Sequence, residues 1–177
     1  MAELLKEIVP GLRRVAVIFN PEISRGGTSY LHSVETAAPL FSIEATGAPV
    51  HHAGDIELAM SSLVREPGGA LIVLPDAFTA SHLKQIIELA ARYKLPAIYA
   101  VRDYANEGGL MAYGTDPVDI YRRAASYIDQ ILKGGNPANL PVQAQTKFGL
   151  VINLNTAKAL GLTVPLSLLD RADEVIE

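Results

Sequence analysis

Short runs of apolar residues alternate along this chain with longer stretches in which apolar residues recur every three or four positions. The runs are typical of buried strands, and the recurring pattern is typical of helices with one apolar face. The predicted strands cover residues 15–19, 41–46, 70–74, 96–100, 110–112 and 148–154. The strand at 41–46 is the weakest of these, because Glu44 interrupts its apolar run.

The predicted helices follow the strands in regular alternation. They cover residues 4–9, 28–40, 55–64, 80–93 and 117–132. Two short helices follow, one from 155–156 to 160 and one that begins at 163–165 and ends in 171–175. Asp55, Thr79 and Asp116 stand where a helix cap is expected. In the helix at 80–93 the buried face is predicted to hold Leu83, Ile86, Ile87 and Ala90. In the helix at 117–132 it is predicted to hold Tyr121, Ala124, Ala125, Ile128, Ile131 and Leu132.

This alternation of apolar strands and helices predicts an α/β fold. Because the strands are apolar throughout, the sheet should be mainly parallel and covered by helices on both faces, which gives three layers. With 177 residues the chain has room for one domain of ordinary size. One long irregular stretch, residues 134–146, contains Pro137 and Pro141 and is expected to run over the surface.

Composition and charge narrow the range of functions. Hydrophobic residues make up 49% and charged residues 19%, so the chain should fold. The net charge is −4, and no basic cluster exceeds Arg122-Arg123, so nucleic acid is not expected as a partner. No apolar run is long enough to insert into a membrane, and the first residues lack the pattern of an export signal.

The sequence has few of the residue patterns that catalysis or cofactors require. It has no cysteine, and its histidine pair, His51-His52, has no third metal ligand nearby, so neither a metal nor a cofactor is predicted. Residues 24–29 hold two glycines between a strand and a helix, but without the lysine or the full glycine spacing of a nucleotide loop. The chain is therefore not expected to be an enzyme.

Polar and aromatic residues follow the predicted strands, where ligands bind to an open parallel sheet. The candidate ligand-binding residues are Asn20, Asp76, Phe78, Arg102 and Tyr113. A carboxylate such as that of Asp76 would pair with a ligand ammonium group, and Phe78 would stack on an apolar or aromatic part. Each residue also has a structural interpretation. Asp76 can cap a helix, Asn20-Pro21 can open a turn, Arg102 can be an ordinary loop charge, and either ring can serve in packing.

Several longer segments resemble one protein family, in the family's own order. These segments are LIVLPDAF, ELAARYKLPAIY, EGGLMAYG, YRRAASYIDQILKGGNPANLPVQ and the last thirty-one residues, from Lys147 to Glu177. Together they resemble the C-terminal part of ABC-transporter substrate-binding proteins, which have the two-lobed, type I periplasmic-binding-protein fold. The resemblance runs from about Leu4 to the end.

This resemblance implies a fold, a function and partners. The chain would be the C-terminal lobe of a solute-binding protein, and residues 113–146 would cross toward an N-terminal lobe. The protein would bind a small molecule, with amino acids among the candidates, in a cleft of which this chain forms half. Its partner would be an ABC permease, and the full-length protein would work in the periplasm or otherwise outside the cytoplasm.

Two other functions remain open at this point. An intracellular ligand-sensing or regulatory domain can have the same fold, and a flavodoxin-like enzyme has the same alternation of elements. One consequence concerns the chain by itself. Apolar faces at 121–132 and 148–154 that are meant for another lobe would be exposed, so the isolated chain is expected to form a homodimer.

Overall fold

A single mixed sheet organises the protein. The computed structural model describes residues 1–24 and 26–177, and Arg25 of the 24–29 loop lies outside the described residues. Within the described residues seven strands form one sheet, in the order β2-β1-β3-β4-β5-β6-β7. The strands are β1 Arg14–Phe19, β2 Glu44–Pro49, β3 Gly69–Val73, β4 Ala97–Tyr99, β5 Met111–Thr115, β6 Phe148–Asn153 and β7 Glu174–Ile176.

Helices connect these strands. The helices are α1 Ala2–Ile8, α2 Gly27–Ala37, α3 Ala53–Leu63, α4 Ala77–Ser81, α5 Leu83–Arg92, α6 Asp103–Asn106, α7 Pro117–Leu132, α8 Leu154–Ala159 and α9 Leu166–Leu169. Two 3-10 turns, η1 Ala38–Phe41 and η2 Pro137–Asn139, complete the elements.

Two apolar cores lie on the two faces of the sheet. The first joins Leu5 and Ile8 of α1 and Leu168 of α9 to strand residues such as Val17 and Ile72. The second is built by α3, α5 and α6 against the opposite face; its members include Ile56, Met60, Ile86, Leu89 and Tyr104. The predicted three-layer α/β/α architecture is therefore confirmed.

The sheet is parallel except at one place. The β5–β6 pair is antiparallel and every other neighbouring pair is parallel. The prediction that the last short helix ends in residues 171–175 is wrong, because α9 ends at Leu169 and residues 174–176 form the strand β7. Three residues flanked by charges give no periodic signal for a strand. The strand β7 pairs with β6 through the register Ile152↔Val175.

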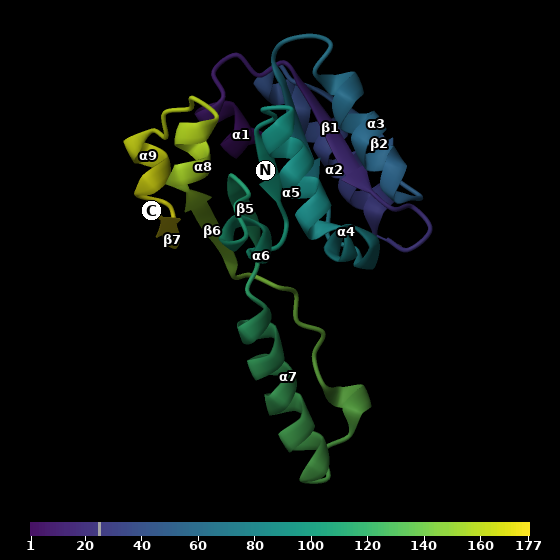
Figure 1. Cartoon of the computed structure of the whole chain (residues 1–177). Helices are drawn as coiled ribbons and strands as arrows, with labels where there is room; N and C mark the ends of the chain where they lie inside the picture. The colour runs from purple at the N-terminus through teal and green to yellow at the C-terminus, as the bar shows by residue number, and fades with distance from the viewer. Residues whose placement is uncertain (25) are drawn as a thin grey trace.

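The segment between β5 and β6 stands away from the rest of the molecule. Figure 1 shows α7 and the returning connector as an arm, residues 116–147, below a body formed by all other elements. Both ends of the arm meet at the sheet, where Thr115 pairs with Phe148. The prediction of a helix at 117–132 is confirmed, but the prediction of its buried face is wrong for this chain. No residue of α7 is buried, because among the described residues only the returning connector lies along it.

Three local predictions are corrected by the structure. His52, not Asp55, is the N-cap residue of α3, and Asp55 is the third helical residue of a capping box. Asp76, not Thr79, caps α4, and the predicted single helix at 80–93 is divided at His82 into α4 and α5. The strand predicted at 41–46 begins instead at Glu44, after Ser42 turns the chain with a φ of 56°.

Candidate functional site

The carboxyl ends of β1, β3, β4 and β5 lie at one edge of the sheet, because these strands are parallel. The elements that leave this edge are the turn after Phe19, α4, α6 and the arm. The five residues predicted to bind a ligand all belong to these strand ends or to their immediate neighbourhood. The structure places them in three separate settings along the edge.

Asn20 and Asp76 are joined directly. The Asn20 backbone N–H donates to Asp76 Oδ2 at 2.9 Å, and the Thr79 N–H donates to Asp76 Oδ1 at 2.8 Å. Asn20 itself is buried, and its Oδ1 accepts from the backbone N–H groups of Glu22 and Ile23 at 2.9 and 3.2 Å. The Asp76 side chain therefore fastens the end of β1 to the end of β3, while the Asn20 side chain stabilises the turn that follows β1.

Phe78 lies in the first turn of α4, next to this pair. Its ring is half-buried and stacks on the His82 imidazole with a centroid distance of 4.2 Å. The His82 Nδ1 is also 2.9 Å from the Phe78 carbonyl oxygen. The ring thus packs partly on its own helix and against the core below it, while its remaining surface stays at the edge.

A tyrosine of α6 holds this part of the edge in place. The Tyr104 hydroxyl donates to the Thr79 carbonyl oxygen at 2.6 Å, which ties α6 to α4. Its ring stacks on Tyr99 of β4 with a centroid distance of 4.5 Å. Burial raises the pKa of Tyr104 to about 12, so the hydroxyl stays protonated and remains a donor at neutral pH.

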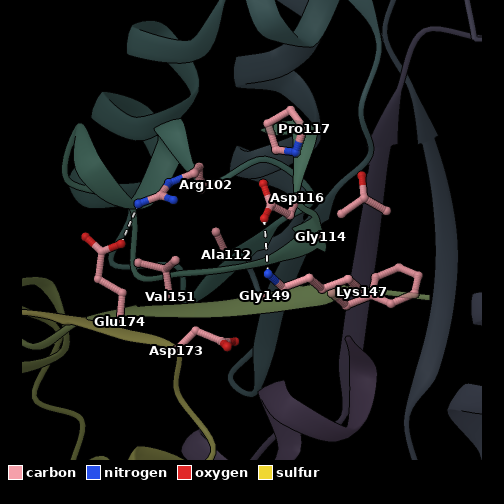
Figure 2. A pocket seen from close by; sticks show the side chains of 12 residues that line it. Arg102, Ala112, Gly114, Asp116, Pro117, Lys147, Gly149, Val151, Asp173 and Glu174 are labelled. Atoms are coloured by element: carbon pink, nitrogen blue, oxygen red, sulfur yellow. Dashed lines mark hydrogen bonds and ion pairs between the residues drawn. The ribbon is translucent and has the colours of Figure 1, made fainter. Parts of the chain in front are cut away.

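A cavity lies at the base of the arm, on the side of the sheet that α6 covers. Its volume is about 180 Å³, below the roughly 300–1,000 Å³ of complete small-molecule pockets. Figure 2 shows that Arg102 enters it from the loop after β4, Asp116 and Lys147 from the two ends of the arm, and Asp173 and Glu174 from the start of β7. Two cations and three carboxylates therefore line one small space.

The charges in this cavity are arranged in pairs. The Arg102 guanidinium pairs with Glu174, and Lys147 Nζ lies 3.5 Å from Asp116 Oδ2. Asp173 Oδ2 accepts from the Leu150 backbone N–H at 2.8 Å. Figure 2 draws the first two pairs on opposite sides of the space. A ligand with one positive and one negative group could pair with a carboxylate and a cation of this cavity at the same time. No charged group would then be left without a partner of opposite charge.

Asp116 has a second task, because it caps α7. Its Oδ1 accepts from the Val118 backbone N–H at 2.9 Å. Burial acts to raise the pKa of Asp116, but hydrogen bonds from the Val118 and Asp119 amides and the nearby Lys147 outweigh it and lower that pKa. The carboxylate is therefore ionised at neutral pH at the point where the arm begins.

Tyr113 is the one predicted residue that points to the other face of the sheet. Successive residues of a strand alternate between faces, so Tyr113 lies opposite Ala112 and Gly114, which line the cavity. Its ring is half-buried and stacks on Phe148 with a centroid distance of 5.7 Å, in a hollow that Leu4 and Arg171 also line. The structure thus separates Tyr113 from Arg102.

Sequence reasoning missed Lys147, Asp173 and Glu174 as candidates at this edge. Two signals were available, since Asp116 follows one predicted strand and Lys147 precedes another. The antiparallel pairing of β5 with β6 is what brings these two ends together. Asp173 and Glu174 gave no signal, because their place depends on β7.

The histidine pair makes only surface contacts. His51 Nδ1 lies 3.2 Å from Glu22 Oε1, and His52 Nε2 lies 3.2 Å from Asp55 Oδ1.

In the described part of the chain no helix is both long and apolar enough to span a membrane.

Comparison with known families gives a direct result. The profile of the ABC transporter substrate binding protein family matches residues 1–176. The chain belongs to this family.

Individual relatives have low sequence identity to this chain. A curated relative, the tyrosine-binding protein of Clostridioides difficile (strain R20291), is 24% identical over 160 residues, which are 90% of this chain and 46% of that protein. A conserved domain protein of Vibrio cholerae is 29% identical and superposes with a TM-score of 0.87, over 98% of this chain and 58% of that one.

Two other solved structures show the same fold. An ABC domain from Streptococcus pneumonia in complex with L-Trp superposes with a TM-score of 0.89 at 23% identity, over 99% of this chain and 59% of that one. A ligand-free, open substrate-binding protein with adhesive properties from Clostridium difficile gives 0.72 at 21% identity, over 98% and 58%. The predicted periplasmic-binding-protein-like fold is confirmed, and the chain spans about half to three-fifths of the length of these relatives.

Proposed function

We propose that this chain supplies one wall of the solute-binding cleft of an ABC import system. The observation that carries the proposal is the cavity of paired charges at the carboxyl edge of the sheet, where Arg102 meets both ends of the arm. In open α/β sheets this edge is where ligands bind. The full-length protein would work outside the cytoplasm and deliver its solute to a permease.

The charges at the edge favour an amino acid as the solute. An α-carboxylate would pair with Arg102 or Lys147, and an α-ammonium group would pair with Asp116 or Glu174. Phe78, on α4 at the same edge, offers a ring surface to an aromatic side chain. The tyrosine-binding relative and the L-Trp complex support a solute of this class.

The other predicted residues receive different roles in this proposal. Asn20 and Asp76 would shape the cleft floor, because their polar atoms already bond to the backbone of the edge. Asp76 would meet the solute only through the outer side of its carboxylate. Tyr113 would act from the opposite face by supporting Phe148 at the base of the arm.

The arm is the segment that we propose crosses toward an N-terminal lobe. It leaves and re-enters the body at neighbouring backbone positions, Thr115 and Phe148. Two strands that run side by side into the arm form a narrow connection, as the hinge of a two-lobed protein requires. The proposed crossing segment covers residues 113–146, with its outer part in α7 and the connector.

A thermal-shift comparison tests the proposed function. Two proteins are compared, this chain alone and a fusion that we call the two-lobed form. In the fusion, this chain follows the part of the Vibrio cholerae relative to which this chain has no counterpart. We expect tyrosine, tryptophan or another amino acid to raise the melting temperature of the two-lobed form, because a ligand that binds only the folded state stabilises it. A folded two-lobed form that responds to nucleotides and to no amino acid would contradict the proposal.

A further inference from the structure

The helix α6 stands between two parts of the carboxyl edge. On one side lie the ends of β1 and β3 with α4, which carries Phe78. On the other side lie β5, β6 and the base of the arm, where the cavity of paired charges is found. Arg102 is the residue just before α6. The two proposed contacts for a solute, Phe78 and Arg102, therefore belong to different elements.

The helix α6 is too short to be stable by itself. It covers only Asp103–Asn106, about one turn, and a helix of this length gains few backbone hydrogen bonds for the residues that it orders. Its position must come from contacts with its neighbours. Asn153 supplies one of these contacts, because its Nδ2 donates to the Ala105 carbonyl oxygen at 3.1 Å and holds α6 to the end of β6.

Tyr104 supplies the contact on the other side of α6. Its hydroxyl donates to the Thr79 carbonyl oxygen at 2.6 Å, and both residues are buried. That carbonyl lies in the last turn of α4, where carbonyl groups lose the donors that a continuing helix would provide. Among the described residues this is the single side-chain hydrogen bond between α4 and α6.

Both partners of this hydrogen bond are themselves held in place. The Thr79 N–H donates to Asp76 Oδ1 at 2.8 Å, and the Thr79 hydroxyl donates to the Leu74 carbonyl oxygen at 2.9 Å. The Tyr104 ring stacks on Tyr99 of β4, with an angle of 11° between the two ring planes. A hydrogen bond between two fixed groups keeps α4 and α6 at a constant separation.

The two ends of this hydrogen bond are neighbours of the two proposed solute contacts. Thr79 follows Phe78 directly, and Tyr104 is two residues beyond Arg102. A shift of α4 relative to α6 would therefore change the separation between the Phe78 ring and the Arg102 guanidinium. The Tyr104 hydroxyl opposes such a shift.

We propose that Tyr104 is a positioning residue for solute recognition, which sets the separation between the Arg102 and Phe78 contacts. This inference rests on the proposed function, because it concerns two contacts of that site. A solute with an aromatic side chain would span both contacts and bind best when they are already in place. Without the Tyr104 hydroxyl the solute itself would have to order α4 against α6, which lowers its affinity. Tyr104 thus favours aromatic amino acids over smaller ones.

A double-mutant cycle in the two-lobed form tests the proposal, with binding of L-tryptophan measured by isothermal titration calorimetry. Tyr104→Phe keeps the ring and removes the hydroxyl. It should weaken binding about fivefold, as expected for the loss of one neutral hydrogen bond. In a Phe78→Ala background the solute no longer spans both contacts, so the same Tyr104→Phe change should alter the affinity less than about twofold.

Tyr99→Phe is the matched control. It removes a hydroxyl from the other ring of the same stacked pair, in β4, and leaves the hydrogen bond from Tyr104 to Thr79 in place. This variant should bind tryptophan like the wild type. Thermal melts followed by circular dichroism should show that every variant is folded at the temperature of the titration.

Two results would overturn this inference and leave the proposed function intact. One is tryptophan binding that Tyr104→Phe does not change. The other is binding that Tyr104→Phe weakens equally with and without the Phe78 ring, as a general loss of structure would do. A wild-type two-lobed form that binds only amino acids without an aromatic ring would also overturn this inference alone. If the folded wild type binds no amino acid, the proposed function fails and this inference fails with it.

Discussion

Gly114 and Gly149 lie directly opposite each other in the antiparallel register of β5 and β6, yet their surroundings differ sharply. A Cβ atom at Gly114 would lie 1.8 Å from the Ala100 carbonyl oxygen, whereas one at Gly149 would lie no nearer than 3.7 Å from Asp173 Oδ2. The end of β4 thus presses against the backbone of β5 just below the arm. This contact fixes the place where the arm leaves the sheet.

Substitutions at these two glycines should therefore have unequal effects. Gly114→Ala requires the backbone of β4 or β5 to move and should lower the free energy of unfolding by about 3 kcal/mol. The Cβ atom that Gly149→Ala adds lies at an ordinary contact distance from its nearest neighbour. This substitution should change the free energy of unfolding by less than about 1 kcal/mol. Urea denaturation of both variants measures the difference. Equal losses of stability would show that the close contact between β4 and β5 is wrong.

Asp76 should be needed for stability whether or not it touches a solute. Asp76→Ala removes the acceptors of the Thr79 and Asn20 N–H groups and should lower the free energy of unfolding by about 2 kcal/mol. Asp103→Ala, an exposed carboxylate at the same edge, is the control and should change it by less than about 0.5 kcal/mol. If both variants unfold at the same urea concentration, the capping role assigned to Asp76 is refuted.

The capping box of α3 should make stability depend on pH. Hydrogen bonds from the His51 and His52 backbone N–H groups hold the pKa of Asp55 below its ordinary value of about 3.9. A carboxyl group whose pKa is lowered in the folded state stabilises the fold above its unfolded-state pKa. That contribution disappears as the pH falls through the folded-state pKa.

The variant Asp55→Asn tests this dependence. It should be less stable than the wild type at neutral pH, and the gap between their melting temperatures should narrow below about pH 4. Glu35→Gln, at an exposed position of α2, should track the wild type throughout. A gap between Asp55→Asn and the wild type that does not narrow as the pH is lowered would contradict the account.

Arg102 should act on solute affinity with little effect on stability. Its ion pair with Glu174 is half exposed, and such pairs contribute less than about 1 kcal/mol. In the two-lobed form, Arg102→Ala should weaken binding of an amino acid about tenfold or more, measured by isothermal titration calorimetry. Arg92→Ala breaks a comparable pair with Glu57, which joins α5 to α3 and does not line the cavity, and should leave affinity unchanged. Similar affinities for the two variants would remove Arg102 from the proposed site.

The pattern of apolar residues was sufficient to predict the layered fold. The strands at 15–19 and 70–74 are buried on both faces, and continuous apolar runs of this length are typical of a parallel sheet covered on both faces. The helix caps were harder to predict. Asp76 and Thr79 each suit an N-cap, and the reciprocal bonds of a capping box make them look equivalent in the sequence.

The arrangement at the arm could not be predicted in the same way. Apolar periodicity in α7 predicts a buried face, but burial depends on a partner surface, and within the described residues only the connector contacts this helix. The cavity depends on the reversal of β6 relative to β5 and on β7, which are long-range pairings. Arg102 could therefore be named as a candidate, while its partner Glu174, seventy-two positions away, could not.

The central claim, that a solute binds at the carboxyl edge of the sheet, is tested most directly by NMR. Amide resonances of this chain within the two-lobed form would be followed during titration with tyrosine and tryptophan. We expect the largest shifts at Phe78, Arg102 and Asp116, with little change at the opposite edge near Lys94. Shifts concentrated near Lys94, or saturable binding that leaves the carboxyl edge unchanged, would contradict the account.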